Sequence, residues 1–320
     1  MKDVVLITGG AGVIGANLTK KLLQSNSAKK IIIVDNLSSG KLTNINDLNV
    51  EFYNADITNS ERLKLAFTHK PNKIYHLAAL FANQNSVDHP EKDLSVNGVG
   101  TINTLRESIA SNVEKVLYAS SSCVYGNHKN MAEKNVGELD TPYAITKLLG
   151  EHYLRFYSNH YNLEATSVRI FNTYGPCDYP GMYRNVIPNF FLQAIQGKPL
   201  AVHGNGNSIR TYTYVEDLVD GLIHLMNNVQ NENKYDVFNF GSSDSIKTID
   251  LANMINKITS NKAGVIFQPT RSWDHITSRK PNLEKSSKFG QSINTYSLEE
   301  GLNKYYQWLV NDKEYKKLFN

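Results

Sequence analysis

The sequence predicts an α/β protein, in which a doubly wound parallel sheet is followed by a smaller mixed C-terminal lobe. Three observations lead to this fold class. Short apolar, β-branched runs recur through roughly the first half of the chain, stretches with helical spacing separate them, and turn-forming residues interrupt the alternation after Phe171. Alternating strands and helices are typical of right-handed crossovers, which build a parallel sheet with helices on both faces.

The elements of the first half follow from these two patterns. Each short apolar run is typical of a strand that is buried on both faces, and each stretch between runs places its apolar residues on one side of a helix. Strands are expected over residues 4–8, 30–34, 50–54, 73–77, 115–119 and 165–170, and helices over 14–23, 60–67, 99–109 and 143–157.

The second half is less regular. Turn-forming groups such as Tyr174-Gly175-Pro176 indicate a change of architecture. Helices are expected over 188–196, 215–226, 247–258 and 298–309, short strands over 199–203, 237–240 and 264–267, and a frayed end over 311–320. We therefore expect a first domain over residues 1–175, to which 211–245 also contribute, and a second lobe over 176–320.

Composition narrows the function classes. The 320 residues carry a formal net charge of +4, and the Lys and Arg residues are spread along the chain, which argues against a nucleic-acid partner. Cys123 and Cys177 are too few for a disulfide framework or a zinc cluster. No apolar stretch approaches the about 20 residues of a membrane span. We expect a cytoplasmic protein without a metal or a membrane partner.

A glycine-rich segment over residues 8–15 joins the first expected strand to the first expected helix. Glycines permit the tight turn there and let main-chain N–H groups approach a pyrophosphate, whose charge the helix N-terminus favours. Two glycine spacings fit, Gly9/Gly12/Gly15 and Gly10/Gly12/Gly15. Strand, glycine turn and helix together indicate a dinucleotide site of the Rossmann type.

The second expected strand ends in an acidic residue, Asp35. A carboxylate at this place accepts hydrogen bonds from the adenosine ribose hydroxyls and repels the 2′-phosphate of NADP, so NAD is the expected cofactor. Asp56 and Ile57 are an expected contact with the adenine edge, although a simple turn explains them equally well. The residues expected to bind the cofactor at this end are Gly9, Gly12, Val13, Ile14, Gly15, Asp35, Asn36, Asp56 and Ile57.

Tyr143 and Lys147 lie four residues apart on an expected helix, so their side chains share one face. A lysine ammonium stabilises a neighbouring phenolate, which lets a tyrosine act as a base near neutral pH. The spacing alone is common on helix surfaces. The serine run 120–122 supports the catalytic interpretation, because it ends the preceding strand at the sheet edge where ligands of doubly wound folds bind. The same run also fits an ordinary exit from a strand.

These motifs resemble the extended short-chain dehydrogenase/reductase family, and within it the nucleotide-sugar epimerases and dehydratases. The resemblance covers essentially the whole chain. It rests on Thr8-Gly-Gly-Ala-Gly-Val-Ile-Gly15, His76-Leu-Ala-Ala79, Asn97-Gly-Val-Gly-Thr101, Ser120-Ser-Ser-Cys-Val-Tyr-Gly126, Tyr143 to Lys147, Arg169-Ile-Phe-Asn172, Tyr174-Gly-Pro176, Asn185-Val-Ile-Pro188 and Tyr214-Val-Glu-Asp217.

The resemblance implies roles for several residues. Ser121 would assist Tyr143, and Lys147 would also hold the nicotinamide ribose. Ala78 and Ala79 would line the cofactor, with Asn97 on the adjoining helix near it. Family members commonly pair through the helix that carries the Tyr and Lys, which implies a homodimer. The alternative is that the apolar residues Leu148, Leu149, Tyr153 and Phe156 face the core of their own chain.

Comparison with subclasses of the family narrows the reaction. Dehydratases of this kind carry Asp-Glu after the catalytic hydroxyl, and UDP-glucuronate decarboxylases keep the Glu, whereas this chain has Ser122 and Cys123. GDP-fucose synthases pair a Cys here with a histidine at the position of Asn185. In 4-epimerases an asparagine at that position contacts the substrate diphosphate. The resemblance therefore implies epimerisation at C4 of a UDP-sugar, such as UDP-glucose/UDP-galactose, through a 4-keto sugar.

Residues of the C-terminal lobe suggest the nucleotide carrier. Arg210, Arg271 and Asp274 match positions that hold the diphosphate and ribose in UDP-sugar 4-epimerases, and arginine is suited to phosphate oxygens. Ser278 stands where hexose-only members carry a tyrosine, which leaves room for the 2-acetamido group of UDP-GlcNAc/UDP-GalNAc. The full set expected to bind substrate is Ser121, Ser122, Asn172, Asn185, Val202, Arg210, Arg271, Asp274 and Ser278.

Two other functions remain open at this stage. The nearer one is a nucleotide-sugar 4,6-dehydratase, or a decarboxylase or epimerase of UDP-glucuronate. The more distant one is a non-catalytic NAD- or RNA-binding relative, since a fold does not fix a function. Such relatives tend to lose the tyrosine and lysine, which this chain keeps.

Overall fold

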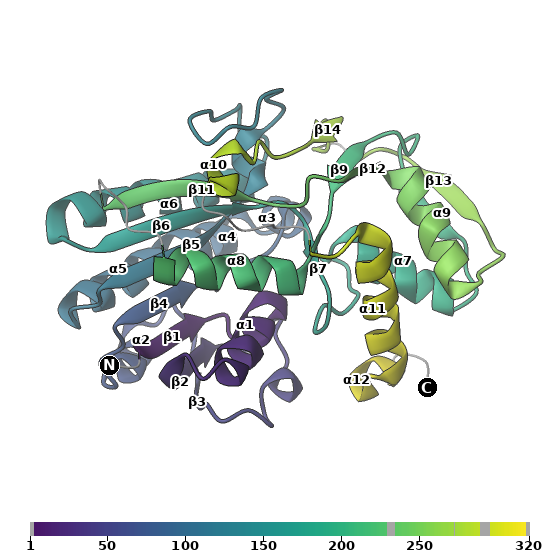
Figure 1. Ribbon diagram of the computed structural model, residues 1–320. Coiled ribbons are helices and arrows are strands. Elements are labelled where there is room, and N and C mark those ends of the chain that lie inside the picture. Colours follow the sequence, from purple (N-terminus) through teal and green to yellow (C-terminus); the bar gives the residue numbers. More distant parts are fainter. Residues whose placement is uncertain (1–2, 229–233, 272, 289–294, 318–320) are drawn as a thin grey trace.

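The computed structural model describes residues 3–228, 234–271, 273–288 and 295–317. Its centre is a parallel sheet of seven strands in the order β11-β6-β5-β4-β1-β2-β3 (Figure 1). The strands are β1 (Asp3–Thr8), β2 (Ala28–Asp35), β3 (Glu51–Asn54), β4 (Lys73–His76), β5 (Lys115–Ser121), β6 (Glu164–Ile170) and β11 (Tyr235–Phe240). The predicted doubly wound α/β fold is confirmed.

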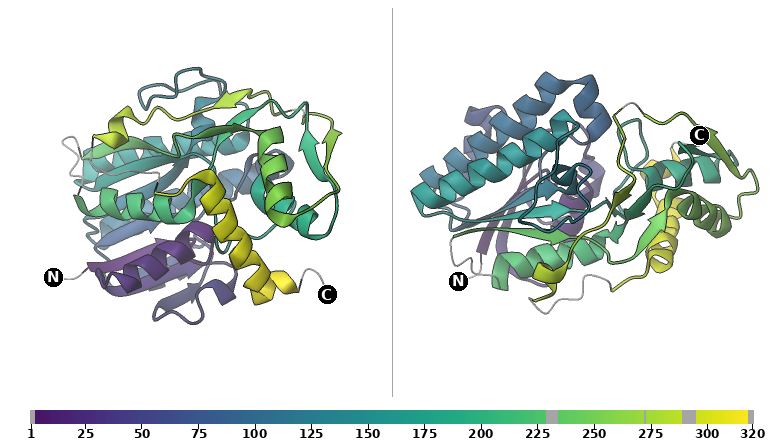
Figure 2. Two further views of the ribbon diagram at one scale, coloured as in Figure 1. Left: turned by 45° about the vertical axis from the view of Figure 1, so that its right-hand side comes forward. Right: turned by 90° about the horizontal axis from the view of Figure 1, so that it is seen from above.

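Helices cover both faces of the sheet (Figures 1 and 2). On one face lie α1 (Val13–Gln24) and α8 (Val215–Asn228), and on the other α2 (Ser60–Phe67), α5 (Gly100–Ala110) and α6 (Pro142–Tyr161). Successive side chains of a strand point to opposite faces. In β1, Val5 and Ile7 therefore pack in the cluster with α1 and α8, while Leu6 packs with α5 and α6. Burial on both faces explains the continuous apolar runs in the sequence.

The order of the strands reverses between β1 and β4. From β1 the chain proceeds outward to β2 and β3, and from β4 it proceeds the other way to β5 and β6. The loops after these two central strands therefore separate and leave a crevice at their carboxyl ends, where ligands of such sheets bind. Short helical segments follow β2, β4 and β5 at this edge: η1 (Leu42–Asn44), α3 (Asn83–Asp88), α4 (Pro90–Asp93), η2 (Leu94–Val99) and η3 (Ser122–Tyr125).

A second core lies beside the sheet, around Phe190, Phe191, Leu251, Leu302 and Tyr305. Three helices build it, α7 (Val186–Ile195), α9 (Thr248–Thr259) and α11 (Leu298–Asn311). Small sheets join β7 (Thr173–Tyr174) to β10 (Thr213–Tyr214), β8 (Leu200–His203) to β13 (Val265–Gln268), and β9 (Ile209–Thr211) to β12 (Ser245–Lys247) and β14 (Ser278–Arg279). A single turn, α10 (Glu284–Ser287), follows β14.

The end of the chain differs from the expectation of fraying. Residues 313–316 form a further helical turn, α12 (Lys313–Lys316), because the Tyr315 side chain is buried in the second core. Residues 318–320 lie outside the described residues. Within the described residues, no helix has both the length and the apolar character needed to cross a bilayer.

Candidate active site

A cavity of about 360 Å³ runs along the carboxyl ends of the central strands, from the glycine loop to Tyr143. Its size is within the range of small-molecule sites. Most residues expected to bind the cofactor line it, although they come from the end of β2, from the segments that follow β1, β2, β3 and β4, and from α1 and α6. These are Gly9, Gly12, Val13, Ile14, Gly15, Asp35, Asn36, Asp56, Ile57, Ala78, Ala79, Tyr143 and Lys147.

The glycine loop packs so closely against neighbouring main chain that side chains would not fit at Gly9 and Gly15. Gly9 has φ +72°, and a Cβ there would lie 2.7 Å from the main-chain nitrogen of Ala78. A Cβ on Gly15 would lie 2.5 Å from Cα of Gly10. Gly12 caps helix α1 without a side-chain hydrogen bond, which leaves the first N–H groups of the helix for an anion. Gly10 packs against Ile33 and does not line the cavity, so the spacing in use is Gly9/Gly12/Gly15.

Asp35 connects the end of β2 to the glycine loop. Its carboxylate accepts hydrogen bonds from the main-chain N–H groups of Ala11 (3.0 Å) and Leu37 (2.8 Å), and burial raises the pKa of this carboxyl. Further along the cavity, Asn36 donates a hydrogen bond to Asp56 at 2.7 Å. These contacts hold the carboxylates at the end of the cavity where an adenosine would lie.

Asn97 lies on η2, next to the loop that follows β4. Its side chain is buried behind the cavity wall, where Oδ1 accepts a hydrogen bond from the Leu80 N–H at 2.8 Å and Nδ2 donates to Asp93. It does not line the cavity. Asn97 therefore positions the loop after β4, whose residues Ala78 to Asn83 do line the cavity.

Helix α6 presents the tyrosine and the lysine together. Pro142 stands in its first turn and the Thr141 hydroxyl accepts a hydrogen bond from the Ala144 N–H, so the helix begins just before Tyr143. The Lys147 ammonium lies 5.6 Å from the centroid of the Tyr143 ring and donates a hydrogen bond to the Ala119 carbonyl at 2.9 Å. The structure thus places both groups at the end of β5, beside Ser121.

Burial has the largest effect on the pKa values of Tyr143 and Lys147. Burial raises the pKa of the Tyr143 phenol, the neighbouring Cys123 and Asp93 raise it further, and only a hydrogen bond with Ser121 lowers it. Burial also lowers the pKa of Lys147 to about 8. Removing both groups from water disfavours their charged forms.

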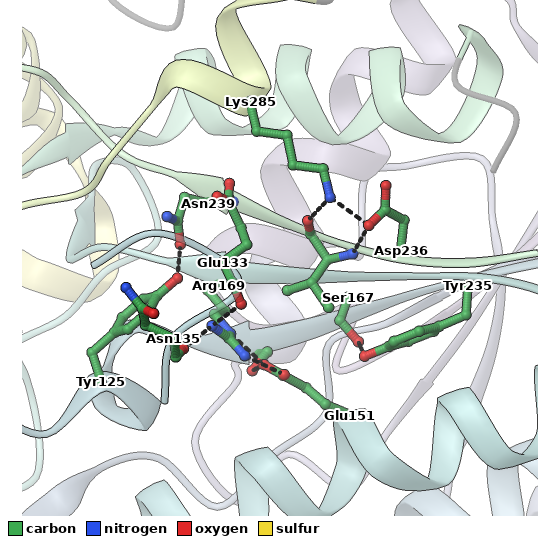
Figure 3. A network of polar contacts seen from close by, with 12 residues as sticks. Tyr125, Glu133, Asn135, Glu151, Ser167, Arg169, Tyr235, Asp236, Asn239 and Lys285 are labelled. Carbon is green, nitrogen blue, oxygen red and sulfur yellow. Dashed lines mark hydrogen bonds and ion pairs between the residues drawn. The ribbon is translucent and has the colours of Figure 1, made fainter. Parts of the chain in front are cut away.

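A buried polar network behind the site joins Arg169 of β6 to Glu151 of α6 (Figure 3). Arg169 forms a two-pronged ion pair with Glu151, with Nε to Oε1 at 2.9 Å and Nη2 to Oε2 at 2.8 Å. Ser120 donates a hydrogen bond to the same carboxylate. Because Glu151 follows Lys147 by one turn of α6, the ion pair ties this helix to β6, and the hydrogen bond of Ser120 ties it to β5, the strand that carries Ser121.

Some of the expected substrate residues line one of two cavities, and the others line neither. Ser121, Asn172 and Asn185 line the main cavity, and Arg210 and Asp274 line a second, adjoining cavity, where they form an ion pair at 3.4 Å. The remaining residues of the expected set line neither cavity. Val202 is fully buried in the second core, Ser122 is buried, Arg271 is exposed beside His203, and Ser278 is half-buried in β14.

Comparison with known proteins identifies the family. A model of the NAD dependent epimerase/dehydratase family matches residues 5–241. The chain belongs to this family. An epimerase of Methanothermobacter thermautotrophicus has a solved structure with TM-score 0.93 and 41% identity, covering 99% of this chain and 95% of that one. The UDP-glucose 4-epimerase of Thermotoga maritima, solved with UDP-glucose, has TM-score 0.90 and 29% identity, covering 99% and 100%.

Enzymes with a different reaction are equally similar in sequence. The UDP-glucuronic acid decarboxylase 1 of Danio rerio is 31% identical over 324 residues, which cover 98% of this chain and 74% of the relative. Membership of the NAD dependent epimerase/dehydratase family fits the glycine cradle and Asp35, and the cofactor of this enzyme is NAD. The reaction within the family needs evidence from the site.

Some residues of this epimerase/dehydratase site are absent from the sequence-based set. Phe81, Asp178, Arg184 and Arg279 all line the main cavity. Arg184 follows the Tyr-Pro-Gly turn and donates a hydrogen bond to the Ser39 carbonyl at 2.7 Å, which connects the second lobe to the loop after β2. Arg279 directly follows Ser278, but nothing in the local sequence distinguishes it from a surface arginine.

Proposed function

We propose that the chain is an NAD-dependent epimerase that inverts C4 of a UDP-sugar through a transient 4-keto sugar. The observation that carries this proposal is the set of groups around Tyr143. Ser121 and Lys147 lie beside the phenol, and the next side chain toward the second cavity is the thiol of Cys123. A carboxyl group for a separate proton transfer at C5, C6 or the leaving group is missing from that position, whereas epimerisation needs none.

Each residue of the site has a separate role in this proposed reaction. Tyr143 takes the proton of the sugar 4-hydroxyl and later returns it, and Ser121 holds the same oxygen by a hydrogen bond. Lys147, held by the Ala119 carbonyl, contributes a positive charge and hydrogen bonds toward the nicotinamide ribose. NAD held by the glycine loop, Asp35 and Lys147 would supply hydride transfer at C4, and its positive charge would favour the ionised form of Tyr143.

Inversion requires that the 4-keto sugar turn its other face to the cofactor. The nucleotide must stay bound during this rotation, and we assign its diphosphate to Asn185 and Arg210 at the cavities and its nucleoside to the lobe formed by residues 176–210 and 246–317. The presence of UDP-glucose in the solved structure of the Thermotoga maritima epimerase supports a UDP-sugar as the substrate.

Acceptance of 2-acetamido sugars stays a prediction. In β14 the Ser278 and Arg279 side chains point to opposite faces, and it is Arg279 that lines both cavities. Ser278, which was expected to leave room for an acetamido group, lines neither cavity. The assay described below tests acceptance of these sugars directly.

We also propose a homodimer that pairs through α6 and its neighbour. The two helices α5 and α6 lie side by side on the outer surface (Figure 2). Leu148 and Tyr153 pack partly against their own chain, but Phe156, Ile145 and Tyr161 of α6 are 46%, 52% and 51% exposed. An exposed apolar patch of this kind is typical of a protein interface.

Incubation with UDP-glucose, UDP-GlcNAc and UDP-glucuronate, followed by NMR, tests the reaction. The expected product is the C4 epimer of at least one of them, without a net change in NAD redox state. A 4-keto-6-deoxy sugar would instead identify a dehydratase, and released CO2 a decarboxylase. Absence of any conversion by NAD-loaded protein would favour a non-catalytic relative.

A further inference from the structure

The guanidinium of Arg279 lies at the boundary of the two cavities without a carboxylate partner. Arg279 is 9% exposed and lines both cavities. Its Nη1 donates a hydrogen bond to Sγ of Cys123 at 3.3 Å, and within the described residues its buried Nε has no hydrogen-bond partner. A buried charge without compensation is costly, so this group is prepared for an anion that the protein does not supply.

A second arginine increases the positive charge. The parallel register of β14 and β9 places Arg279 opposite Arg210, so that both side chains leave the small sheet on one face. Burial lowers the pKa of Arg210, and the charge of Arg279 lowers it further. Asp274 lies 3.4 Å from Arg210. The exposed Asp140 lines the second cavity, but among the described residues it forms no ion pair with Arg279. Among the described residues, Arg210 therefore has a carboxylate partner and Arg279 has none.

The position of Arg279 decides which part of the substrate it meets. Its partner Cys123 follows Ser121 by two residues, and Ser121 is hydrogen-bonded to Tyr143, where C4 of the sugar must lie. In a nucleotide sugar the diphosphate is attached to C1, across the ring from C4. The substituent of C5 is adjacent to C4. An anion that meets Arg279 beside the reacting carbon is therefore carried by C5 and differs from the diphosphate.

We propose that Arg279 selects a nucleotide sugar whose C6 is a carboxylate, that is, a UDP-uronic acid. The inference rests on the proposed function, since it takes C4 to be the reacting carbon. A planar guanidinium suits a carboxylate, because it can donate two parallel hydrogen bonds to the two oxygens. Neutral hexoses, which carry a hydroxymethyl group at C5, leave the charge of Arg279 uncompensated and bind less well.

The test compares UDP-glucuronate with UDP-glucose on NAD-loaded protein, by kcat/KM from NMR and by Kd from calorimetry. Wild-type protein is expected to favour UDP-glucuronate in both measurements. Arg279→Met should lower the ratio of the two affinities, uronate over hexose, by about 10- to 100-fold, the range for a lost charged hydrogen bond. Arg279→Lys should retain an intermediate ratio. Lys280→Met removes the neighbouring exposed charge and should leave the ratio unchanged.

Each other outcome has a distinct meaning. A wild-type preference for UDP-glucose would overturn the role of Arg279. This comparison uses the wild type alone and therefore does not depend on whether a variant folds. An equal loss for both sugars in Arg279→Met would also overturn it, since a contact with the diphosphate serves both. Release of CO2 with the ratio shift intact would support the carboxylate contact and overturn the proposed epimerisation. If no sugar is converted, the Kd ratios still decide the role of Arg279.

Discussion

At the scale of single residues, the candidate reactive groups of this enzyme are buried, and burial disfavours their charged forms. Tyr143 is 5% exposed, and burial raises the pKa of its phenol. The lysine that would stabilise a phenolate is itself buried, with its pKa lowered to about 8. A positive charge supplied by a bound cofactor would favour the ionised tyrosine, so we expect proton transfer to require a loaded site.

Replacement of Tyr143 by Phe tests the proton-transfer role. The variant removes one hydroxyl from a buried ring and keeps its packing against Phe81, whose ring centroid lies 6.0 Å away. The expected loss in kcat is about 10²- to 10⁴-fold, with NAD content and thermal stability close to wild type. Near-normal turnover would contradict the assignment of Tyr143 as the acid and base.

The buried lysine predicts a pH dependence of stability. The folded-state pKa of Lys147 is about 8, below its ordinary value of 10.5, so between these values the unfolded chain binds more protons than the folded one. Stability must then rise with pH through this window, and the unfavourable contribution is complete below pH 8. Urea unfolding of NAD-free wild type and Lys147→Met measures the effect. The free energy of unfolding of the wild type should rise relative to that of the variant from about pH 8 to about pH 10. A difference independent of pH would contradict the lowered pKa.

At the scale of elements, helix α6 is the part of the fold on which the chemistry depends. Tyr143, Lys147 and Glu151 recur every four residues on its inner face, and the ion pair of Glu151 with Arg169 attaches that face to the sheet. Close approach of the helix to β5 requires Gly150, since a Cβ there would lie 2.5 Å from Cζ of Tyr118.

Replacement of Gly150 by Ala should therefore displace the helix. In an exposed helix this change stabilises by about 1 kcal/mol, but here we expect an overpacking cost of about 1–3 kcal/mol and a reduced kcat, because Tyr143 and Lys147 move with the backbone. Urea unfolding and the C4 assay measure the two effects. His152→Ala, an exposed position on the same helix, is the control and should change stability by less than about 0.5 kcal/mol. A Gly150→Ala variant more stable than wild type would show that the contact with Tyr118 relaxes easily.

At the scale of the whole molecule, the site lies between the sheet and the second lobe, and several contacts join the two around it. Arg184 donates to the Ser39 carbonyl, Lys41 lies 3.8 Å from the Tyr179 ring centroid, and Trp273 donates to Gln84 at 2.8 Å. These contacts hold the second lobe against the loops that follow β2 and β4.

The proposed homodimer makes a prediction at the same scale. Phe156→Glu places a charge in the exposed apolar patch of α6 and should shift the protein from dimer to monomer, because burial of an unpaired charge in an interface is costly. Analytical ultracentrifugation measures the shift. Phe267→Glu is the matched control, since Phe267 is 60% exposed in β13 of the second lobe and should leave the mass unchanged. A monomeric wild type would refute the interface.

The sequence by itself determined the fold class and the residues that meet at the candidate active site. The glycine loop, Asp35, Ser121 and the Tyr143–Lys147 pair are local patterns at strand ends and on one helix, and in a parallel sheet the carboxyl ends of all strands meet at one edge. Proximity along the chain and the regular geometry of strand and helix were sufficient to bring them together.

Only the tertiary structure decided which residues of the second lobe reach the site. Arg279 meets Cys123 because β14 pairs with β9, a register between segments far apart in the chain, and a shift by one residue would have brought Ser278 there instead. Val202 proved to be core for the same reason. Which face of a short strand points inward depends on long-range packing, and no local pattern encodes it.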